Sequence, residues 1–191
     1  MQRINDEVLT NKVIPDPIAS AAQCALEHFP ELKNTPITFR FNEKAGKSVM
    51  KAQPEFRSFF RKRSQRRYYI FISRTFNLGG QVFNTKQIPE EVMIGWLGHE
   101  LGHIMDYETR SKWNLFWFGL RYLFQPSYTR KAERVADTFA VENGMEAYIL
   151  KTKNFILEHA DLPERYKARI RRYYLSPEAI VELVQERDRI S

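Results

Sequence analysis

Apolar and polar residues alternate along two short stretches in the first half of the chain, which is the pattern of half-buried β-strands. These stretches are Pro36–Phe41 and Arg67–Ser73, and both are rich in β-branched or aromatic residues. Before them, Pro17–Phe29 is rich in alanine and carries apolar residues at helical spacing, so it predicts a helix. The pattern of Val49–Phe56 fits no single element. The first half therefore predicts a small sheet with one helix.

Helical spacing of apolar residues dominates the second half. Gly79-Gly80 predicts a turn, and Pro89 suits the first position of a helix that continues to about Tyr107. Strands followed by helices predict an α+β fold, with a small N-terminal mixed sheet and a helical C-terminal half. With 191 residues and no repeat or Gly/Ser linker, we expect one domain over residues 1–191. Further helices are expected from Pro126–Thr129 to Gly144, over Met145–His159, over Pro163–Tyr174 and over Pro177–Ile190.

The charge and cysteine content narrow the classes of partner and site. Thirty basic and 23 acidic residues give a net charge of +7, which favours an anionic partner such as a phospholipid surface, nucleic acid or an acidic substrate. Cys24 is the only cysteine, so an intrachain disulfide and a Cys-based zinc site are excluded. Met1–Pro15 lacks the apolar segment of a signal peptide, and no apolar run reaches the length of a spanning helix. We therefore expect a cytoplasmic location.

The helix that begins near Pro89 carries the sequence HELGH at residues 99–103. Because residues i and i+4 share one face of a helix, His99 and His103 can direct two imidazole nitrogens at one metal ion. Glu100 lies beside them, where a carboxylate can take a proton from an attacking water. The motif predicts a zinc-dependent hydrolase.

A catalytic zinc site takes three protein ligands and keeps one position open, so a third ligand is needed. Asp106 follows one turn after His103, but three ligands from one straight helix cannot easily surround a tetrahedral ion. We expect Asp106 to support the ligands from outside or to accept an N–H instead. Glu133 lies on a separate predicted helix and shares a face with Asp137. One of these carboxylates can bind the metal while the other accepts the remaining N–H of a ligand histidine.

The joint pattern of HExxH followed by ExxAD resembles the gluzincin metallopeptidases. It most resembles the group that contains the heat-shock-induced membrane endopeptidases and the CAAX-prenyl endopeptidases, over about Pro89–Ala140. The resemblance implies a zincin-like metallopeptidase domain that binds Zn²⁺ and hydrolyses a protein or peptide substrate. This chain departs from those relatives because it carries no spanning segment. Carried over residue by residue, the zinc ligands are His99, His103 and Glu133, the catalytic carboxylate is Glu100, and the supporting carboxylate is Asp137.

Other features of the site are less sharply predicted. Gly95, Gly98 and Gly102 would each weaken an isolated helix by about 1 kcal/mol, so we expect another backbone or the metal to approach this helix closely. The strand Arg67–Ser73 could pair with an extended peptide as an added strand. The donor to the tetrahedral oxyanion is not assigned. Its candidates are Tyr107, Tyr128, Tyr148, His159 and the arginines.

An unusually apolar block, Trp113–Phe124, separates the two predicted ligand helices. It is too short to span a bilayer, but its aromatic residues and basic flanks suit peripheral contact with an anionic membrane. A buried helix or hairpin, an oligomer interface and a hydrophobic substrate groove are the alternatives.

Basic residues also cluster in two further places, with aromatic residues nearby. Such clusters can bind nucleic acid, although no recognised nucleic-acid module accompanies them. Two alternative functions follow: a metallopeptidase-like sensor or regulatory binding domain with little turnover, and a DNA-associated protease. The first cluster, within a connection or short helix before the second strand, holds Arg57, Arg61, Lys62, Arg63, Arg66 and Arg67; the second holds Arg165, Lys167, Arg169, Arg171 and Arg172.

Overall fold

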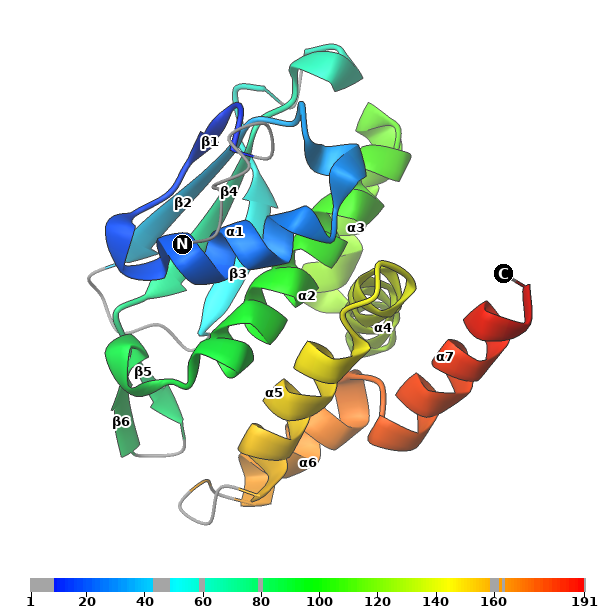
Figure 1. The fold of residues 1–191 in the computed structure, drawn as a ribbon. Coiled ribbons are helices and arrows are strands. Elements are labelled where there is room, and N and C mark those ends of the chain that lie inside the picture. Colours follow the sequence, from blue (N-terminus) through cyan, green and yellow to red (C-terminus); the bar gives the residue numbers. More distant parts are fainter. Residues whose placement is uncertain are drawn as a thin grey trace.

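The computed structural model describes residues 9–42, 49–58, 61–78, 81–158, 162 and 164–190. The fold is mixed α+β, as predicted. A long helix, α2 (Glu90–Thr109), runs between the sheet with helix α1 (Ala19–Glu27) on one side and the remaining helices on the other (Figure 1). Helix α2 contacts elements from both halves, so it lies at the centre of the hydrophobic core.

The main sheet has four strands in the order β1 (Lys12–Val13), β2 (Ile37–Asn42), β4 (Tyr68–Ser73) and β3 (Met50–Pro54). Strand β2 is parallel to both of its neighbours, whereas β3 is antiparallel to β4. A separate two-stranded sheet pairs β5 (Thr75–Leu78) with β6 (Gln81–Asn84) in antiparallel register.

The two predicted strands are confirmed, but the expected substrate-pairing role of Arg67–Ser73 is wrong. Strand β4 is hydrogen-bonded to β2 on one side and to β3 on the other, so it offers no free edge to a peptide. The ambiguous stretch Val49–Phe56 provides β3, which pairs only with β4 among the described strands. The predicted turn at Gly79-Gly80 lies outside the described residues.

The predicted helices are present, and their ends differ from the expectations by a few residues. The apolar block is a helix that follows Ser111, whose side chain accepts a hydrogen bond from the Asn114 N–H at 3.3 Å. No helix within the described ranges is long and apolar enough to cross a membrane. The helices after α2 are α3 (Lys112–Phe124), α4 (Pro126–Glu142), α5 (Glu146–Glu158), α6 (Glu164–Tyr173) and α7 (Pro177–Ile190), and the 3₁₀ turns are η1 (Asp16–Ile18), η2 (Pro30–Leu32), η3 (Arg63–Gln65) and η4 (Thr85–Gln87).

Glycines let two other helices cross α2 at very short range, as the sequence predicted. A Cβ atom at Gly102 would meet the carbonyl oxygen of Ala136 on α4, closer than real Cβ atoms come. A Cβ atom at Gly95 would likewise meet Thr152 and the Tyr148 carbonyl on α5. The absence of a side chain at these positions therefore fixes how α4 and α5 pack on α2.

Arg66 is buried, so it does not belong to a solvent-exposed basic cluster as the sequence suggested. Its side chain is only 3% exposed, and its Nη1 donates to the carbonyls of Tyr107 and Arg110, both at 3.0 Å. A cation that binds the last carbonyls of a helix is favoured by the helix dipole. Arg66 thus stabilises the C-terminal end of α2 and ties the segment before β4 to it.

Candidate metal centre

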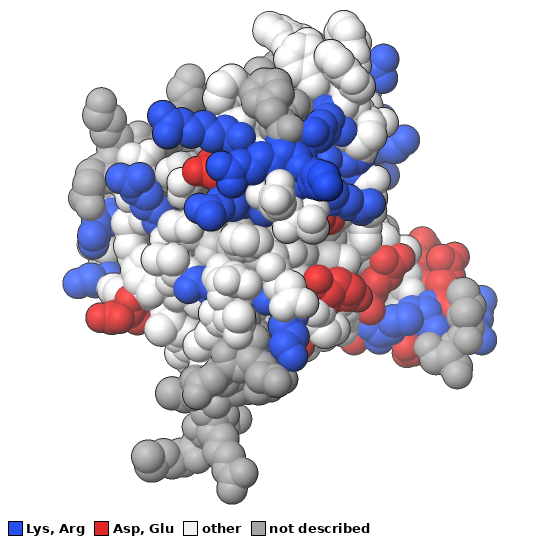
Figure 2. Space-filling model, turned by 90° about the horizontal axis from the view of Figure 1, so that it is seen from above, with Lys and Arg blue, Asp and Glu red and all other residues white. Residues whose placement is uncertain are grey.

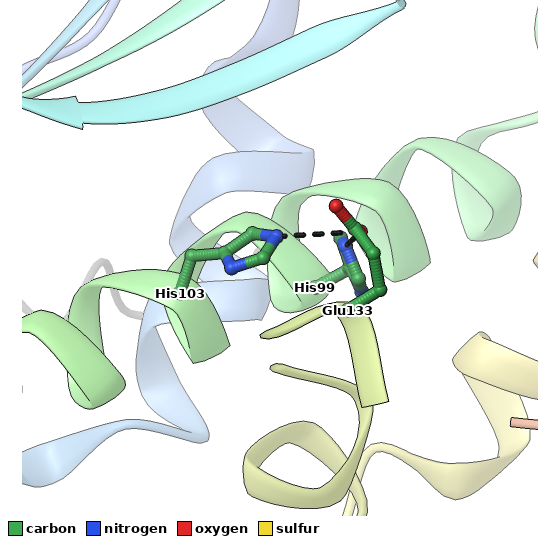
Figure 3. Close-up of side chains that lie close together, drawn as sticks. All are labelled: His99, His103 and Glu133. Atoms are coloured by element: carbon green, nitrogen blue, oxygen red, sulfur yellow. Dashed lines mark hydrogen bonds and ion pairs between the residues drawn. The ribbon is translucent and has the colours of Figure 1, made fainter. Parts of the chain in front are cut away.

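Three side chains from two helices converge at the middle of α2 and could hold a metal ion. His99 and His103 come from successive turns of α2, and Glu133 comes from α4 (Figure 3). Glu133 Oε2 lies 3.0 Å from His99 Nε2 and 3.5 Å from His103 Nε2. All three side chains are buried, and their ligand atoms lie within 4.8 Å of one another. The structure thus brings together the three residues that the sequence nominated as metal ligands.

The close crossing of α2 and α4 explains why the cluster forms. Gly102 contacts Ala136, one turn after Glu133 on α4. This contact draws the two helices together beside His103, and Glu133 then faces both imidazole rings. The ring centroids of His99 and His103 are 4.7 Å apart, with planes at 83°, so the two nitrogens approach the cluster from different directions.

Asp137 orients the first histidine. Its Oδ1 lies 2.9 Å from His99 Nδ1, which leaves His99 Nε2 directed at Glu133. The other carboxylate oxygen accepts hydrogen bonds from Lys153 Nζ at 2.7 Å and from the Leu175 N–H at 3.0 Å. Asp137 therefore has the position expected of the supporting carboxylate, and it is itself held by α5 and by the segment between α6 and α7.

The buried ionisable side chains of the cluster change one another's pKa. Burial raises the pKa of Asp137, but Lys153 and His99 outweigh this effect and lower it overall. Burial likewise opposes ionisation of Glu133, but the two histidines bring its pKa well below the usual value. For His99, burial lowers the pKa, yet its hydrogen bonds to Asp137 and Glu133 raise it to about 10. The two carboxylates thus favour a positive charge at this point.

Tyr122 on α3 holds the second oxygen of Glu133. Its hydroxyl donates to Glu133 Oε1 at 2.5 Å. Burial and the nearby Glu133 charge raise the pKa of Tyr122, so the phenol stays protonated and able to donate. Glu133 can therefore present one oxygen to the histidines while the other is fixed.

Glu100 occupies the side of the cluster that faces the sheet. Its Oε2 accepts a hydrogen bond from the Ala52 N–H of β3 at 2.5 Å. Burial raises the pKa of Glu100, and this effect outweighs the opposing influence of His103 and His99. The Tyr107 hydroxyl lies 3.4 Å from the Ala52 carbonyl. Both backbone groups of Ala52 are thus directed at α2.

Asp106 accepts N–H hydrogen bonds, which is one of its two expected roles, but the donor is Arg110 and not a ligand histidine. The two bonds come from Nε at 3.0 Å and from Nη2 at 2.9 Å. The reason is helical spacing, because Arg110 lies four residues further along the same face. His103 Nδ1, in turn, has no hydrogen-bond partner among the described residues.

The candidate oxyanion donors are scattered over the molecule. Of the tyrosines considered, Tyr107 lies at the centre, with its ring stacked 6.1 Å from that of His103. Tyr148 lies elsewhere, because its hydroxyl is 3.7 Å from Cys24 Sγ on α1. Tyr128 packs against Phe118 of α3, and His159 lies outside the described residues.

Sequence reasoning missed three residues at this centre: Lys153, Tyr122 and Tyr174. The ring of Tyr174 lies 5.3 Å from that of His99, and burial raises the pKa of its hydroxyl well above the usual value. For Lys153 a signal did exist. It falls four residues after Ile149 and three before Ile156, so a lysine occupies the buried apolar face of α5. Tyr122 and Tyr174 have no comparable signal.

A small cavity of about 70 Å³ adjoins His99 and Glu100. Its other walls are largely apolar and include Met50, Trp96 and Ile156. A larger hollow of about 520 Å³ lies between the start of α1 and the β5–β6 hairpin, and none of the three cluster residues lines it. Of these two, only the small cavity could therefore admit part of a substrate next to His99 and Glu100.

The arrangement combines two imidazoles and a carboxylate at one point, an oriented second carboxylate beside them, and an adjoining apolar cavity. Such a centre can bind a divalent cation and move a proton at Glu100. Comparison of the chain with models of known protein families, with curated proteins and with solved structures finds no match. The geometry of the centre itself therefore carries the functional conclusion.

Proposed function

We propose that the protein is a zinc-dependent peptidase of the gluzincin type, in which His99, His103 and Glu133 hold the zinc ion. The observation that carries this proposal is the convergence of these three ligand atoms beside Glu100. The sheet next to the motif helix and the helical second half agree with the zincin-like domain that the resemblance implies.

The donor set fits zinc. Two imidazole nitrogens and one carboxylate oxygen are a common ligand set of catalytic zinc, which keeps a fourth position open. Tetrahedral zinc with bonds of about 2.1 Å to nitrogen and oxygen separates two ligand atoms by roughly 3.4 Å. The separations of 3.0 and 3.5 Å between Glu133 Oε2 and the two imidazole nitrogens lie on either side of that value. Both separations that involve Glu133 therefore suit one tetrahedral ion.

Glu100 acts as the proton carrier in the proposed reaction. When bound, zinc supplies a Lewis acid that polarises the scissile carbonyl and lowers the pKa of water. Glu100 accepts a proton as the water oxygen forms its bond to the carbonyl carbon. When the C–N bond breaks, Glu100 returns the proton to the leaving amine. The raised pKa of Glu100, which its burial causes, supports this role.

Strand β3 is the proposed docking edge for an extended peptide substrate. Both backbone groups of Ala52 point away from β4 and towards α2, where Glu100 and Tyr107 contact them. An incoming strand can exchange these contacts for main-chain hydrogen bonds of its own, as in other cases of β-strand addition. The scissile bond would then lie between β3 and the metal cluster.

The test is cleavage of a peptide library, followed by mass spectrometry, with the zinc-loaded wild type and Glu100→Gln. Gln keeps the size of the side chain but cannot carry the proton, so we expect a loss of rate of at least a hundredfold. Zinc content is measured in both proteins, and both should hold one equivalent. Zinc binding without any cleavage would instead favour the sensor or regulatory domain. Equal cleavage by both proteins would contradict the role of Glu100.

A further inference from the structure

Helix α3 has one face in the core and one large aromatic face in solvent. Leu115 and Phe118 are buried, and Tyr122 reaches the metal cluster. On the other face the side chains are strongly exposed. The exposed fractions are 78% for Trp113, 46% for Phe116, 57% for Trp117 and 77% for Phe124. Among the described residues, this one helix holds half of the eight large hydrophobic side chains that are exposed.

These exposed residues form a continuous stripe. Phe116 and Trp117 lie three and four positions after Trp113 and are therefore its neighbours on the helix surface. Phe124 follows two turns after Trp117 on the same side. Aromatic residues gathered on one exposed face, unlike single exposed residues, mark an interaction surface. The stripe needs a partner with an extended apolar layer.

The charge around the stripe has one sign. No aspartate or glutamate occurs between Glu108 and Glu133. The same interval holds five basic residues, and all except the partly exposed Arg110 are exposed. They are Arg110, Lys112, Arg121, Arg130 and Lys131. The partner must therefore be anionic next to its apolar layer.

A second segment with the same character is linked to the residues just before α3. Phe56 is 79% exposed, and the nearby residues Arg57, Arg61 and Lys62 are also exposed. The link runs through the Glu55 N–H, which donates to the Arg67 carbonyl, and through Arg66, which binds the carbonyl of Arg110. Figure 2 shows lysines and arginines gathered in a band across the face seen from above, with little acidic surface among them.

We propose that α3 binds the surface of an anionic phospholipid bilayer and lies in the plane of the interface. At 13 residues the helix is about 20 Å long, so it can lie along the headgroup layer. Its tryptophans and phenylalanines would enter the boundary of the hydrocarbon, and its basic residues would meet lipid phosphates. Tyr122, on the opposite face, stays with Glu133. The lipid surface and the metal cluster are thus contacted by two faces of one helix.

Two other occupants fit the face less well. In a two-fold dimer through α3, Lys112 and Arg121 would face the same stretch of the second copy, and the interval 109–132 offers no acidic residue to pair with them. The phosphates of nucleic acid could pair with the basic residues, but nucleic acid offers no extended apolar layer for the aromatic stripe. Both are outcomes that the experiment distinguishes.

The experiment is vesicle binding by the full chain, followed by tryptophan fluorescence. Only three tryptophans are present, and Trp96 is buried, so Trp96→Phe leaves emission from the two tryptophans of α3 alone. Vesicles of phosphatidylcholine with one third phosphatidylglycerol should shift this emission to the blue. Phosphatidylcholine alone should bind at least tenfold more weakly at the same salt concentration.

Variants assign the binding to α3. In the wild-type background, Trp113→Ser with Trp117→Ser should lower co-sedimentation with the anionic vesicles by at least tenfold. Lys112→Gln with Arg121→Gln should lower it about tenfold on anionic vesicles only. Val181→Ser is the matched control, because Val181 on α7 is 47% exposed, and its substitution should change nothing.

Four results would overturn the proposal. The first is the absence of a blue shift on anionic vesicles, and the second is full binding by the double tryptophan variant. The third is a dimer in light scattering whose α3 tryptophans are already shielded without lipid. The fourth is tighter binding to duplex DNA than to anionic vesicles at equal salt, unaffected by loss of the tryptophans.

Discussion

Lys153 Nζ lies 2.7 Å from Asp137 Oδ2, and both side chains are almost completely buried. The other oxygen of the same carboxylate lies 2.9 Å from His99 Nδ1. Asp137 thus joins a lysine of α5 to a candidate metal ligand of α2. A buried carboxylate between two partners is costly to disturb, because removal of one partner leaves an uncompensated charge.

Lys153→Met should therefore lower the free energy of unfolding by about 3 kcal/mol and weaken zinc binding roughly tenfold or more. The matched control is Lys151→Met on the same helix. Lys151 pairs with Glu91 at the surface, where both side chains are at least half exposed, so its loss should cost less than about 1 kcal/mol. Denaturant unfolding and chelator competition measure the two effects. Equal losses in both variants would show that the buried pair has no special importance.

Gly102→Ala should destabilise the protein by about 3 kcal/mol, because the new Cβ atom would push α4 away through the Ala136 carbonyl. The same displacement moves Glu133 from the histidines, so zinc affinity should fall as well. Gly119→Ala is the control, since a Cβ atom there meets nothing within 4 Å among the described residues. It should raise stability by up to about 1 kcal/mol. A thermal unfolding series compares them, and a stable Gly102→Ala protein with unchanged zinc affinity would contradict the close crossing.

Tyr122→Phe should lower zinc affinity by roughly tenfold while the fold is retained, because Glu133 loses the donor that fixes its second oxygen. Tyr128→Phe serves as control. Tyr128 lies on α4 and packs against Phe118 of α3, and no hydrogen bond from its hydroxyl is found among the described residues. Zinc affinity is measured by competition with a chromogenic chelator. Identical affinities for the two variants would argue against the role of Tyr122.

Zinc binding should release about one proton per ion at pH 7.5. In the metal-free protein the pKa of His99 is about 10, so its ring is protonated at that pH, and a metal ion at Nε2 must displace the proton. Affinity should therefore rise with pH. The stability of the metal-free protein changes in the opposite direction, falling as the pH rises. Protonated His99 contributes its full stabilisation below its ordinary pKa of 6.5, and this contribution is lost as the pH rises through about 10.

Titration calorimetry in two buffers of different ionisation enthalpy measures this release. The observed enthalpies should differ by about one buffer ionisation per zinc ion. Enthalpies that agree in the two buffers would mean that His99 is already neutral in the metal-free protein.

Local patterns in the sequence predicted most of the elements and the three converging side chains. Helical spacing places His99 and His103 on one face whatever the rest of the fold does, and glycines at 95 and 102 signalled the close crossings. Helical spacing after the HELGH helix nominated Glu133 and Asp137 as a pair, but only the resemblance assigned the ligand role to Glu133 rather than to Asp137. The structure shows where Glu133 lies; its function as a ligand stays a prediction.

Long-range features were beyond the sequence. Nothing local shows that Arg67–Ser73 becomes an internal strand, since strand order depends on pairings between distant segments. Arg66 reads as one more surface cation until the end of α2 is placed beside it. For Asp106 the donor itself could have been named from the sequence, because Arg110 lies at i+4 on the same helix.

The most direct test of the central claim is the zinc content of the purified protein, by mass spectrometry after dialysis against a weak chelator. We predict one zinc ion per chain for the wild type, for Glu100→Gln and for Asp106→Asn. Each of His99→Ala, His103→Ala and Glu133→Ala should hold less than a tenth of an equivalent under the same conditions. A folded Glu133→Ala protein that retains one zinc ion with wild-type affinity would contradict the account.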